Sequence, residues 1–370
     1  MKYEFVAPCY FGIESAAAYD FKRIGAQEVR VTDGRIHFVG DEEILAKANL
    51  WSRCAERVMI CLGRFAAPDF DALFDGVFSL PLEEYIPANG RFPVKGSSLS
   101  STLSSVPACQ SIVKKAAVER LRKGHGVQIL EENTDEYRLR FSIRKDMAEV
   151  FLDTSGAGLH KRGYRKTAGV APLKETLAAA ISDIGHVKRD TVVQDPFCGS
   201  GTLVIEAAMK ARNIAPGLHR PFAAESYAFL PKDLFAKARA QAREEEKPDA
   251  TFEGLGTDID PAMVQLATAN ARKAGVGGCC RFGQEDARRF VPGQGALVLA
   301  NPPYGERLME AEQAAELVKA FGKALFQKAD PNACILAADE EFERNIGRKA
   351  RKKRKVYNGM IPCQLYLYYQ

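Results

Sequence analysis

The chain of 370 residues is long enough for two or three domains of about 150 residues each. Its hydrophobic fraction of 46% and charged fraction of 27% are those of an ordinary globular protein, which excludes a disordered or fibrous chain. No apolar run reaches the roughly 18 residues of a membrane span, and the N-terminus lacks a basic segment followed by an apolar core, so we expect a cytoplasmic protein without a membrane partner.

The cysteines and charges indicate which metal sites, disulfides and charged partners the sequence supports. Nine cysteines form no CxxC pair and no histidine lies at ligand spacing, so we expect reduced, mostly buried thiols and no metal site. With 52 Lys and Arg against 47 Asp and Glu, the net charge of +5 is too low to indicate a polyanionic partner by itself. Cations are concentrated at 160–166 and 344–355, and each cluster can be a solvated face or a surface that attracts phosphates.

The first 155 residues predict short strands alternating with helices. The expected strands are 2–8, 28–32, 35–40 and 57–65, the second and third joined by an Asp-Gly turn. The expected helices are 12–25, 41–54, 69–80 and 106–124, the first and last of which end at a glycine. Beyond a Gly- and Ser-rich segment at 90–105, residues 136–154 alternate around a tight turn, typical of a hairpin. We therefore expect two small α+β units side by side.

From about residue 158 the pattern changes to apolar strands separated by longer helices. The expected strands are 191–197, 252–260, 279–286, 295–304, 332–341 and, at the end of the chain, 364–369. This alternation predicts a mostly parallel, doubly wound sheet. Residues 155–169, rich in glycine and cations, are the expected linker.

Segment 195–202, DPFCGSGT, lies between an apolar strand and a helical stretch. Its glycines allow a sharp turn and close approach to a ligand, and the following helix offers free N–H groups. A nucleoside triphosphate is disfavoured because Thr202 stands where a phosphate-binding loop needs lysine. A dinucleotide is a weak fit because Val204 stands at the third glycine position and the next suitable acid is the distant Asp258.

S-adenosylmethionine, an adenosyl cofactor without phosphates, fits the polar residues at successive strand ends. Asp195 can pair with its ammonium, and the backbone at 199–201 can carry its carboxylate and ribose. Asp258 can accept hydrogen bonds from both ribose hydroxyls, and Asp286 can accept one from the adenine amine. Each acid alone can instead be a helix N-cap or turn residue, and Asp260, before a proline, is the expected N-cap of the next helix.

The fourth strand end carries Asn301, Pro302, Pro303 and Tyr304. The prolines must end the strand, because each lacks an N–H and restricts the residue before it. The Asn301 side-chain oxygen and the Pro302 carbonyl can each accept one N–H of an aromatic amine, turning its lone pair toward a methyl donor. Tyr304 can stack on the base. Taken alone, the motif can also be a strand-to-loop turn with a surface tyrosine.

Together, DPFCGSGT, GTDIDP, the Glu-Asp pair at 285–286 and NPPYGER resemble the motifs of class I methyltransferases that act on exocyclic amines. With LDTSGAGLHKRGYR, APLKETLAAAI and RKKRKVYNG, the whole chain resembles the THUMP-containing RNA methyltransferases of the RlmL type. The resemblance implies a Rossmann-like methyltransferase domain with its linker at 156–370, with an antiparallel last strand. It also implies an α+β N-terminal region, with a ferredoxin-like unit at 1–60 and a THUMP RNA-binding domain at 61–155.

The resemblance implies methyl transfer from S-adenosylmethionine to guanine N2 in 23S ribosomal RNA. The residues expected at the reacting amine are Asn301, Pro302, Pro303 and Tyr304. The residues expected to bind the cofactor are Asp195, Phe197, Gly199, Gly201, Thr202, Asp258, Asp286 and Asn301. The residues expected to hold RNA phosphates are Lys161, Arg162, Arg165, Lys166, Lys352, Lys353, Arg354 and Lys355.

Other functions stay open at this stage. An RNA adenine-N6 or transfer-RNA guanine-N2 methyltransferase would use the same motif, because the motif recognises an amine and not the ring that bears it. A ribosome-assembly factor that binds RNA with a vestigial cofactor pocket is the alternative from a different class. An oxidoreductase is the weakest alternative, because the dinucleotide pattern is incomplete.

Overall fold

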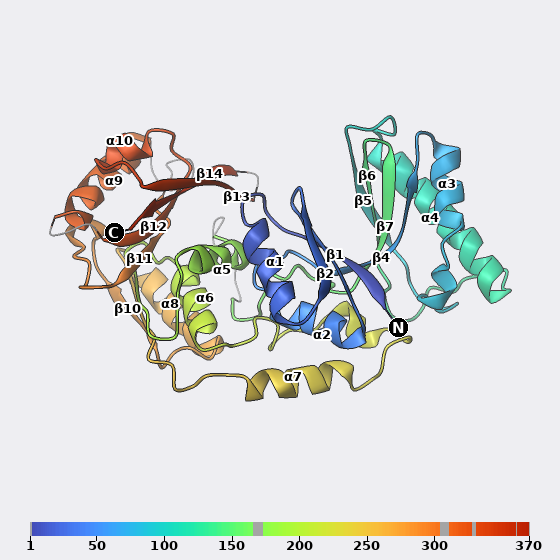
Figure 1. Ribbon diagram of the computed structural model, residues 1–370, viewed down its shortest axis with the longest axis horizontal. Coiled ribbons are helices and arrows are strands. Elements are labelled where there is room, and N and C mark those ends of the chain that lie inside the picture. Colours follow the sequence, from blue (N-terminus) through green and yellow to red (C-terminus); the bar gives the residue numbers. More distant parts are fainter. Residues whose placement is uncertain (1, 166–172, 304–310, 328–330, 360, 370) are drawn as a thin grey trace.

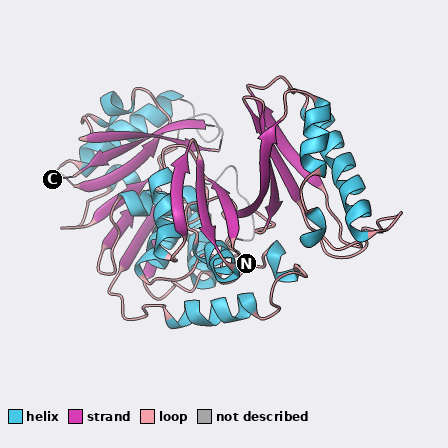
Figure 2. Ribbon diagram, turned by 45° about the vertical axis from the view of Figure 1, so that its right-hand side comes forward, coloured by secondary structure: helices cyan, strands magenta, loops and turns pink. Residues whose placement is uncertain are grey.

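The computed structural model describes residues 2–165, 173–303, 311–327, 331–359 and 361–369. They form two seven-stranded sheets with helices packed on them, one sheet in the N-terminal part of the chain and one in the C-terminal part (Figure 1, Figure 2). In these ranges every helix is too short or too polar to cross a bilayer. The predicted α/β architecture, an α+β region followed by a Rossmann-like domain, is confirmed.

The N-terminal sheet has the strand order β2-β3-β1-β4-β7-β6-β5. Its strands are β1 (Tyr3–Pro8), β2 (Gln27–Thr32), β3 (Arg35–Gly40), β4 (Met59–Ala66), β5 (Val94–Leu99), β6 (Leu139–Arg144) and β7 (Met147–Asp153). Its helices are α1 (Glu14–Arg23), α2 (Glu42–Trp51), α3 (Phe70–Phe78), the 3₁₀ helix η1 (Leu82–Glu84) and α4 (Val106–His125). The expected Asp-Gly turn joins β2 to β3, with Gly34 at a φ of +67°.

The sequence pattern predicts two small α+β units side by side, and β4 belongs to both of them. It pairs with β1 at Met59 and Ile60, and with β7 along its whole length. The order β2-β3-β1-β4, with α1 and α2, is that of a ferredoxin-like unit, and the remaining strands with α3 and α4 extend the same sheet. The two units therefore share a strand.

The glycines near the end of α4 have different roles from the predicted one. The helix passes Gly124, continues to His125 and is capped by Gly126, whose φ of +67° is left-handed. A Cβ at Gly124 would lie 2.6 Å from the carboxyl carbon of Glu83. Gly124 therefore permits close packing, and Gly126 ends the helix.

β5 is a strand that the sequence pattern does not predict. Its sequence VKGSSL is rich in Gly and Ser, yet it pairs in parallel with β6 at the sheet edge. A Cβ at Gly96 would lie 2.3 Å from the ring of Phe141, so the glycine makes room for that ring. Packing against β6 thus outweighs the low strand propensity of β5.

The second sheet has the strand order β10-β9-β8-β11-β12-β14-β13. Its strands are β8 (Val192–Asp195), β9 (Glu253–Asp258), β10 (Cys280–Gln284), β11 (Leu297–Ala300), β12 (Asn332–Ala337), β13 (Lys352–Asn358) and β14 (Ile361–Tyr368). The first five strands of the order are parallel, whereas β14 is antiparallel to both β12 and β13. The predicted parallel sheet with an antiparallel last strand is confirmed.

Helices cover both faces of the second sheet (Figure 1). The helices in this part of the chain are α5 (Glu175–Ile184), α6 (Thr202–Ala211), α7 (Leu234–Glu244), α8 (Pro261–Lys273), α9 (Ala311–Leu325) and α10 (Phe342–Ile346), with the 3₁₀ helices η2 (Ala223–Ser226) and η3 (Ala287–Arg289). Of these, α7 lies against α2 of the N-terminal region. In β11, Leu299 packs in the core with α5 and α6, whereas Val298 and Ala300 pack in the core with α9 and α10. This alternation explains why β11 reads as an unbroken apolar run.

The last four residues of the basic run, 352–355, lie in β13, the edge strand. Lys352, Lys353 and Lys355 are exposed, whereas Val356 is buried. β13 pairs along its length with the apolar β14. Exposed lysines on an edge strand discourage pairing with another chain, which is a structural reason for part of this charge.

The segment between α6 and β9 ties the two sheets together. The Gly217 N–H donates to the Leu50 carbonyl at 2.9 Å, and the Ala224 N–H donates to the Thr154 carbonyl at 3.0 Å. Within the same segment, α7 packs against α2. The second sheet is therefore attached to the N-terminal region by backbone hydrogen bonds in addition to the linker.

A buried ion pair lies where the linker meets α6. The side chains of Arg162 and Glu206 are 2% and 0% exposed, and their Nη2 and Oε2 atoms are 3.4 Å apart. Glu206 also accepts a hydrogen bond from the Tyr164 hydroxyl at 3.1 Å. Burial raises the pKa of Tyr164, so its hydroxyl stays protonated and donates.

Candidate active site

Three adjacent strands bring the predicted cofactor and amine residues to one edge of the second sheet. Asp195 ends β8, Asp258 ends β9, and Asn301 directly follows β11. β8 lies between β9 and β11, and it pairs with β11 through Gln194 opposite Val298. Because the two strands are parallel, Asn301 and the loop after Asp195 leave the sheet at the same ends of their strands. The edge is the carboxyl end of the parallel strands, where open α/β sheets bind ligands.

The loop at 196–201 turns at two glycines. Gly199 has a φ of +48°, and Gly201, the N-cap of α6, has a φ of +83°. A Cβ at Gly201 would lie 3.1 Å from the ring of Phe282, whereas no described atom lies within 4 Å of a Cβ built at Gly199. Gly201 is thus required for packing, and Gly199 leaves an open surface that a ligand can approach.

Asp258 fastens this loop to β9. One of its carboxylate oxygens accepts from the Gly199 N–H at 2.9 Å, and the other accepts from the Asp260 N–H at 3.0 Å. A carboxylate has about four acceptor positions, so further donors such as hydroxyls can still bind. Asp260 caps α8 as predicted, because its side chain accepts from the Ala262 N–H at 2.8 Å.

Asp195 is a buried carboxyl group beside a cavity. The residue is 2% exposed and accepts a hydrogen bond from the Phe197 N–H at 3.0 Å. Burial raises the pKa of Asp195 to about 8; the Phe197 N–H lowers it and the charge of Asp258 raises it. A cavity of about 300 Å³ lies against Asp195, Thr257 and Phe282. Its volume is at the lower end of the range for small-molecule sites.

Two other predicted cofactor residues have partners of their own. The Phe197 ring packs edge-on against Phe321 of α9, with centroids 5.0 Å apart, so it is the backbone of Phe197 that faces Asp195. Asp286 caps η3 and forms an ion pair with Arg288, whose side chain lowers the pKa of that carboxyl. For Asp286 the N-cap alternative is therefore realised, and its contact with adenine stays a prediction.

Sequence reasoning misses Asn270, a residue of α8 that supports the loop. Asn270 is fully buried, and its Nδ2 donates to the Ser200 carbonyl at 3.0 Å. Its neighbours on the buried face of the helix are Ala267 and Ala271. The signal in the sequence is a single amide at helical spacing within an apolar stripe, which also fits an ordinary packing residue.

Asn301, Pro302 and Pro303 belong to the described part of the chain, and Pro302 is buried while the other two are half-buried. Tyr304, predicted to stack on the base, lies outside the described residues. Of the groups predicted to hold the amine, which we call the amine clamp, the structure therefore describes the Asn301 side chain and the Pro302 carbonyl.

The prediction that Arg162 holds RNA phosphates is wrong. Arg162 is 3% exposed, and its guanidinium donates to the Leu159 carbonyl at 2.8 Å in addition to pairing with Glu206. The buried carboxylate of Glu206 needs a positive partner, and that requirement takes the charge of Arg162 into the interior.

The other predicted phosphate ligands differ in exposure. Arg165 has an 11% exposed side chain that donates to Thr202 at the start of α6 and pairs with Glu175 at 3.5 Å, so it lies at the cofactor loop. Lys161 is exposed, and Lys166 lies outside the described residues. The cations of β13 are exposed at Lys352, Lys353 and Lys355 and half-buried at Arg354.

In the described ranges, one group of side chains has the spacing of a metal site. Oxygen and sulfur atoms of Asp20, Cys54 and Asp183 lie within 4.8 Å of one another. The ammonium of Lys210 forms an ion pair with Asp183, and Asp20 accepts from the Arg53 N–H at 2.8 Å. Lys210 already supplies a positive charge there, so the group serves as a contact between α1 and α5.

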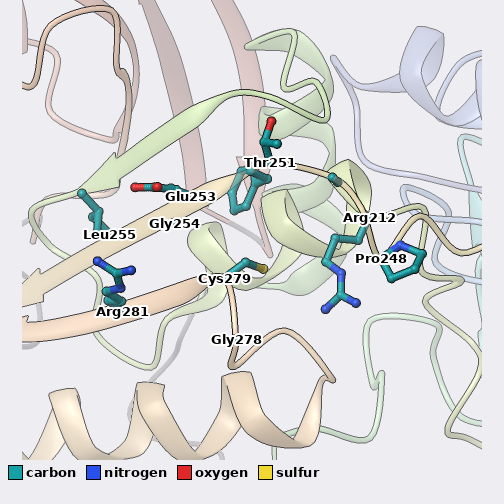
Figure 3. A pocket seen from close by; sticks show the side chains of 11 residues that line it. Arg212, Pro248, Thr251, Glu253, Gly254, Leu255, Gly278, Cys279 and Arg281 are labelled. Carbon is teal, nitrogen blue, oxygen red and sulfur yellow. The ribbon is translucent and has the colours of Figure 1, made fainter.

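A larger cavity, about 550 Å³, lies at the opposite edge of the sheet (Figure 3). Arg212 and Cys279 line it together with the first residues of β9, Glu253 and Gly254. These residues are at the amino ends of the strands, away from Asp195 and Asn301, although Leu255 and Arg281 line both cavities. The smaller cavity beside Asp195 is the one that coincides with the predicted chemistry.

Three family models match successive parts of the chain. Residues 162–366 match the model of the RMKL-like methyltransferase domain, residues 4–59 match the RlmL ferredoxin-like domain, and residues 67–153 match the THUMP domain. The chain is 42% identical over its whole length to "Putative RNA methyltransferase YpsC" of Bacillus subtilis (strain 168), covering 96% of that protein.

Two further similar proteins are a named ribosomal RNA methyltransferase and a solved structure with a bound ligand. The chain is 35% identical to Ribosomal RNA large subunit methyltransferase K/L of Syntrophotalea carbinolica (strain DSM 2380 / NBRC 103641 / GraBd1), with 98% of the chain matched. It spans 53% of that protein's length. The solved structure of SMU.472, described as a putative methyltransferase and bound to SAH, superposes over 100% of this chain and 98% of its own, with a TM-score of 0.93 and 38% identity.

The fold and the edge of the sheet thus define a class I methyltransferase that uses S-adenosylmethionine. The chain belongs to the THUMP-containing RNA methyltransferases of the RlmL type. The site fits this cofactor on two observations of the structure, the open Cβ position at Gly199 and the buried carboxyl group of Asp195 beside a cavity. When bound, the cofactor supplies a methyl group on a sulfonium, and its ammonium can pair with Asp195.

The raised pKa of Asp195 leads to an expected proton release. Below about pH 8 the folded, cofactor-free protein holds a proton on Asp195, which must leave before the carboxylate can pair with an ammonium. At about pH 6.5, S-adenosylmethionine binding should therefore release roughly one proton, while near pH 9 Asp195 should release almost none. Calorimetry in two buffers of different ionisation enthalpy measures this count. Asp195→Asn should abolish the release at the lower pH, and an unchanged count in that variant contradicts the assignment.

Proposed function

We propose that this protein transfers a methyl group from S-adenosylmethionine to the exocyclic N2 of a guanine in large-subunit ribosomal RNA. The observation that supports the amine chemistry is the parallel pairing of β8 and β11, which brings the end of β11, before Asn301 and Pro302, to the same side as the glycine loop after Asp195. The names of the relatives and the THUMP domain support RNA as the substrate.

The residues at the end of β11 suit an amine because they offer acceptors. The lone pair of an aromatic NH₂ is delocalised into the ring, so it must be turned out of the ring plane before it can attack. The Asn301 Oδ1 and the Pro302 carbonyl would each accept one N–H and direct the lone pair toward the cofactor side. Because the nitrogen becomes cationic as the bond forms, the same oxygens stabilise the transition state more than the ground state.

We propose the assignment of roles residue by residue on the same basis. Asp195, the backbone at 199–201, Thr202 and Asp258 would bind the cofactor, and Pro303 would fix the distance between the clamp and the base. Because these positions come from adjacent strand ends or from the loop joined to Asp258, they can act on one ligand. Positioning should supply most of the rate, since no strong base is required at this edge.

We also propose the division of the chain at 60/61 and 155/156. The matched ranges of the three family models support it. The first boundary falls inside the shared strand β4, so the ferredoxin-like and THUMP parts would fold on one sheet. In this arrangement the exposed cations of β13 and Lys161 would meet RNA phosphates, and binding should weaken as salt rises.

The experiment that tests the substrate is nucleoside mass spectrometry of RNA from cells with and without the gene. Loss of N2-methylguanosine from large-subunit ribosomal RNA, restored by the gene and not by its Asn301→Ala variant, is the expected result. A second candidate, adenine-N6 methylation, follows from the same clamp, because Asn301 and Pro302 contact only an NH₂ group. Loss of N6-methyladenosine with N2-methylguanosine intact would replace the guanine assignment.

A further inference from the structure

Two aromatic residues from opposite ends of the chain meet at β13, the outermost strand of the second sheet. Phe11, in the loop between β1 and α1, lies edge-on to Tyr357 of β13, with ring centroids 6.1 Å apart and planes at 64°. The Phe11 side chain is exposed, with a residue exposure of 48%, and Tyr357 is half-buried. Neither ring is used by the chemistry described above.

The contact is held by the backbone around it. The Gly12 Cα faces the Lys355 carbonyl so closely that a Cβ there would lie 2.0 Å from the oxygen, and Gly12 has a φ of +89°. Arg354 donates from Nη1 to the Gly12 carbonyl at 3.3 Å. Only glycine fits at this junction, so the N-terminal loop and β13 have a fixed mutual position.

The junction lies, like Asn301, at the carboxyl ends of the parallel strands. Lys355 pairs with Gln364 of β14, which in turn pairs with Ala337 at the carboxyl end of β12, so Tyr357 extends past that end. β11 and β13 are separated by β12 and β14, which is three strand spacings or roughly 15 Å. A nucleic acid strand advances about 3.4 Å per stacked nucleotide, so the junction is a few nucleotides from the amine clamp.

The surroundings of the two rings suit a nucleic acid strand. The Lys355 ammonium lies 5.7 Å from the Tyr357 ring centre, and the Lys355 residue is exposed. Asp33 is also exposed near this edge, next to Gly34, whose Cβ position lies 3.4 Å from the Phe11 ring. An exposed aromatic ring next to a lysine is a combination that binds unpaired nucleotides, the ring by stacking on a base and the cation by contact with a phosphate.

We infer that Phe11 and Tyr357 form a stacking seat for an unpaired nucleotide that flanks the target base of the RNA. This inference rests on the proposed function only in that RNA is the substrate. The seat would be shared between the N-terminal region and the methyltransferase domain, so it holds the strand while the target base enters the site. It depends on π faces and not on hydrogen bonds to base edges, and therefore accepts any base.

The test compares RNA binding by Phe11→Ala and wild-type full-length protein. The probe is a fluorescently labelled single-stranded RNA of roughly 12 nucleotides, and the same sequence as a duplex serves as the second probe. Phe11→Ala should weaken binding of the single strand about tenfold, while duplex binding changes little. Phe11→Trp should restore binding, because it returns an aromatic face. Calorimetry with S-adenosylmethionine should give the wild-type affinity for both variants.

The matched control is Tyr19→Ala. Tyr19 is an aromatic residue of α1 that is 62% exposed, so its loss removes a similar surface ring from the same unit. Equal single-strand affinity for Phe11→Ala, Tyr19→Ala and wild type would overturn the inference. RNA binding requires no turnover, so an error in the guanine assignment leaves this result unchanged. If Phe11→Ala binds the single strand normally while cells without the gene lose N2-methylguanosine, the stacking seat is wrong and the proposed function stands.

Discussion

Asn301→Ala is expected to lower the rate of methyl transfer by about 10²–10³-fold while leaving S-adenosylmethionine binding largely intact. The change removes one of two acceptors that would hold the amine, and the lost interaction is strongest when the nitrogen carries positive charge. The cofactor loop should keep its shape, because the Asp258 bond to the Gly199 N–H and the Asn270 bond to Ser200 do not involve Asn301. A single-turnover assay with a labelled methyl group measures the chemical step directly.

Asn301→Asp is the matched variant for this experiment. Aspartate retains an acceptor oxygen at the same position, although it replaces the amide NH₂ with a second, negatively charged oxygen, so it should keep considerably more activity than alanine. Calorimetry with S-adenosylmethionine, run on all three proteins, separates a catalytic defect from a loss of cofactor. Wild-type turnover in Asn301→Ala would remove the amine clamp from the mechanism.

Glu206→Leu is expected to destabilise the protein by about 3–5 kcal/mol. The substitution leaves the guanidinium of Arg162 buried at 2% exposure without its carboxylate, and it removes the acceptor of the Tyr164 hydroxyl. A loss of this size should lower the melting temperature by roughly 10 °C. Thermal unfolding followed by circular dichroism measures it.

The double variant Glu206→Leu with Arg162→Met tests the cause. Removing both charges should recover part of the loss, because no unpaired ion is then buried. Recovery should be incomplete, because Arg162 also donates to the carbonyls of Leu159 and Arg53. The exposed pair Asp233 and Lys237 is the control, and Asp233→Ala should leave the melting temperature unchanged. A double variant as unstable as Glu206→Leu alone would show that lost packing is responsible.

The strand ends of the second sheet are predictable because their signals are local. A short apolar run that is followed by a glycine turn, an acid or two prolines marks the end of a strand without information from elsewhere in the chain. The parallel order then places Asp195, Asp258 and Asn301 at one edge, as the structure shows. Asn270 escapes this reasoning because its partner, the Ser200 carbonyl, is 70 residues away.

Charge alone does not reveal which side of a segment faces solvent. Arg162 and Lys161 are adjacent in one basic cluster, yet Arg162 is buried and Lys161 is exposed. The difference arises from Glu206, a buried carboxylate of a distant helix that requires a positive partner. A count of cations therefore overestimates the phosphate-binding surface of the linker.

By itself, the sequence determined the parallel strands of the second sheet, the class of the cofactor and the kinds of side chain that each strand end presents, because all three depend on residues close together in the chain. Only the tertiary structure decided that β4 serves two units, that Arg162 lies in the interior, and that Phe11 meets Tyr357. These features depend on pairing and burial between segments far apart in the chain. The hydrophobic periodicity of one segment does not show which distant segment it will contact.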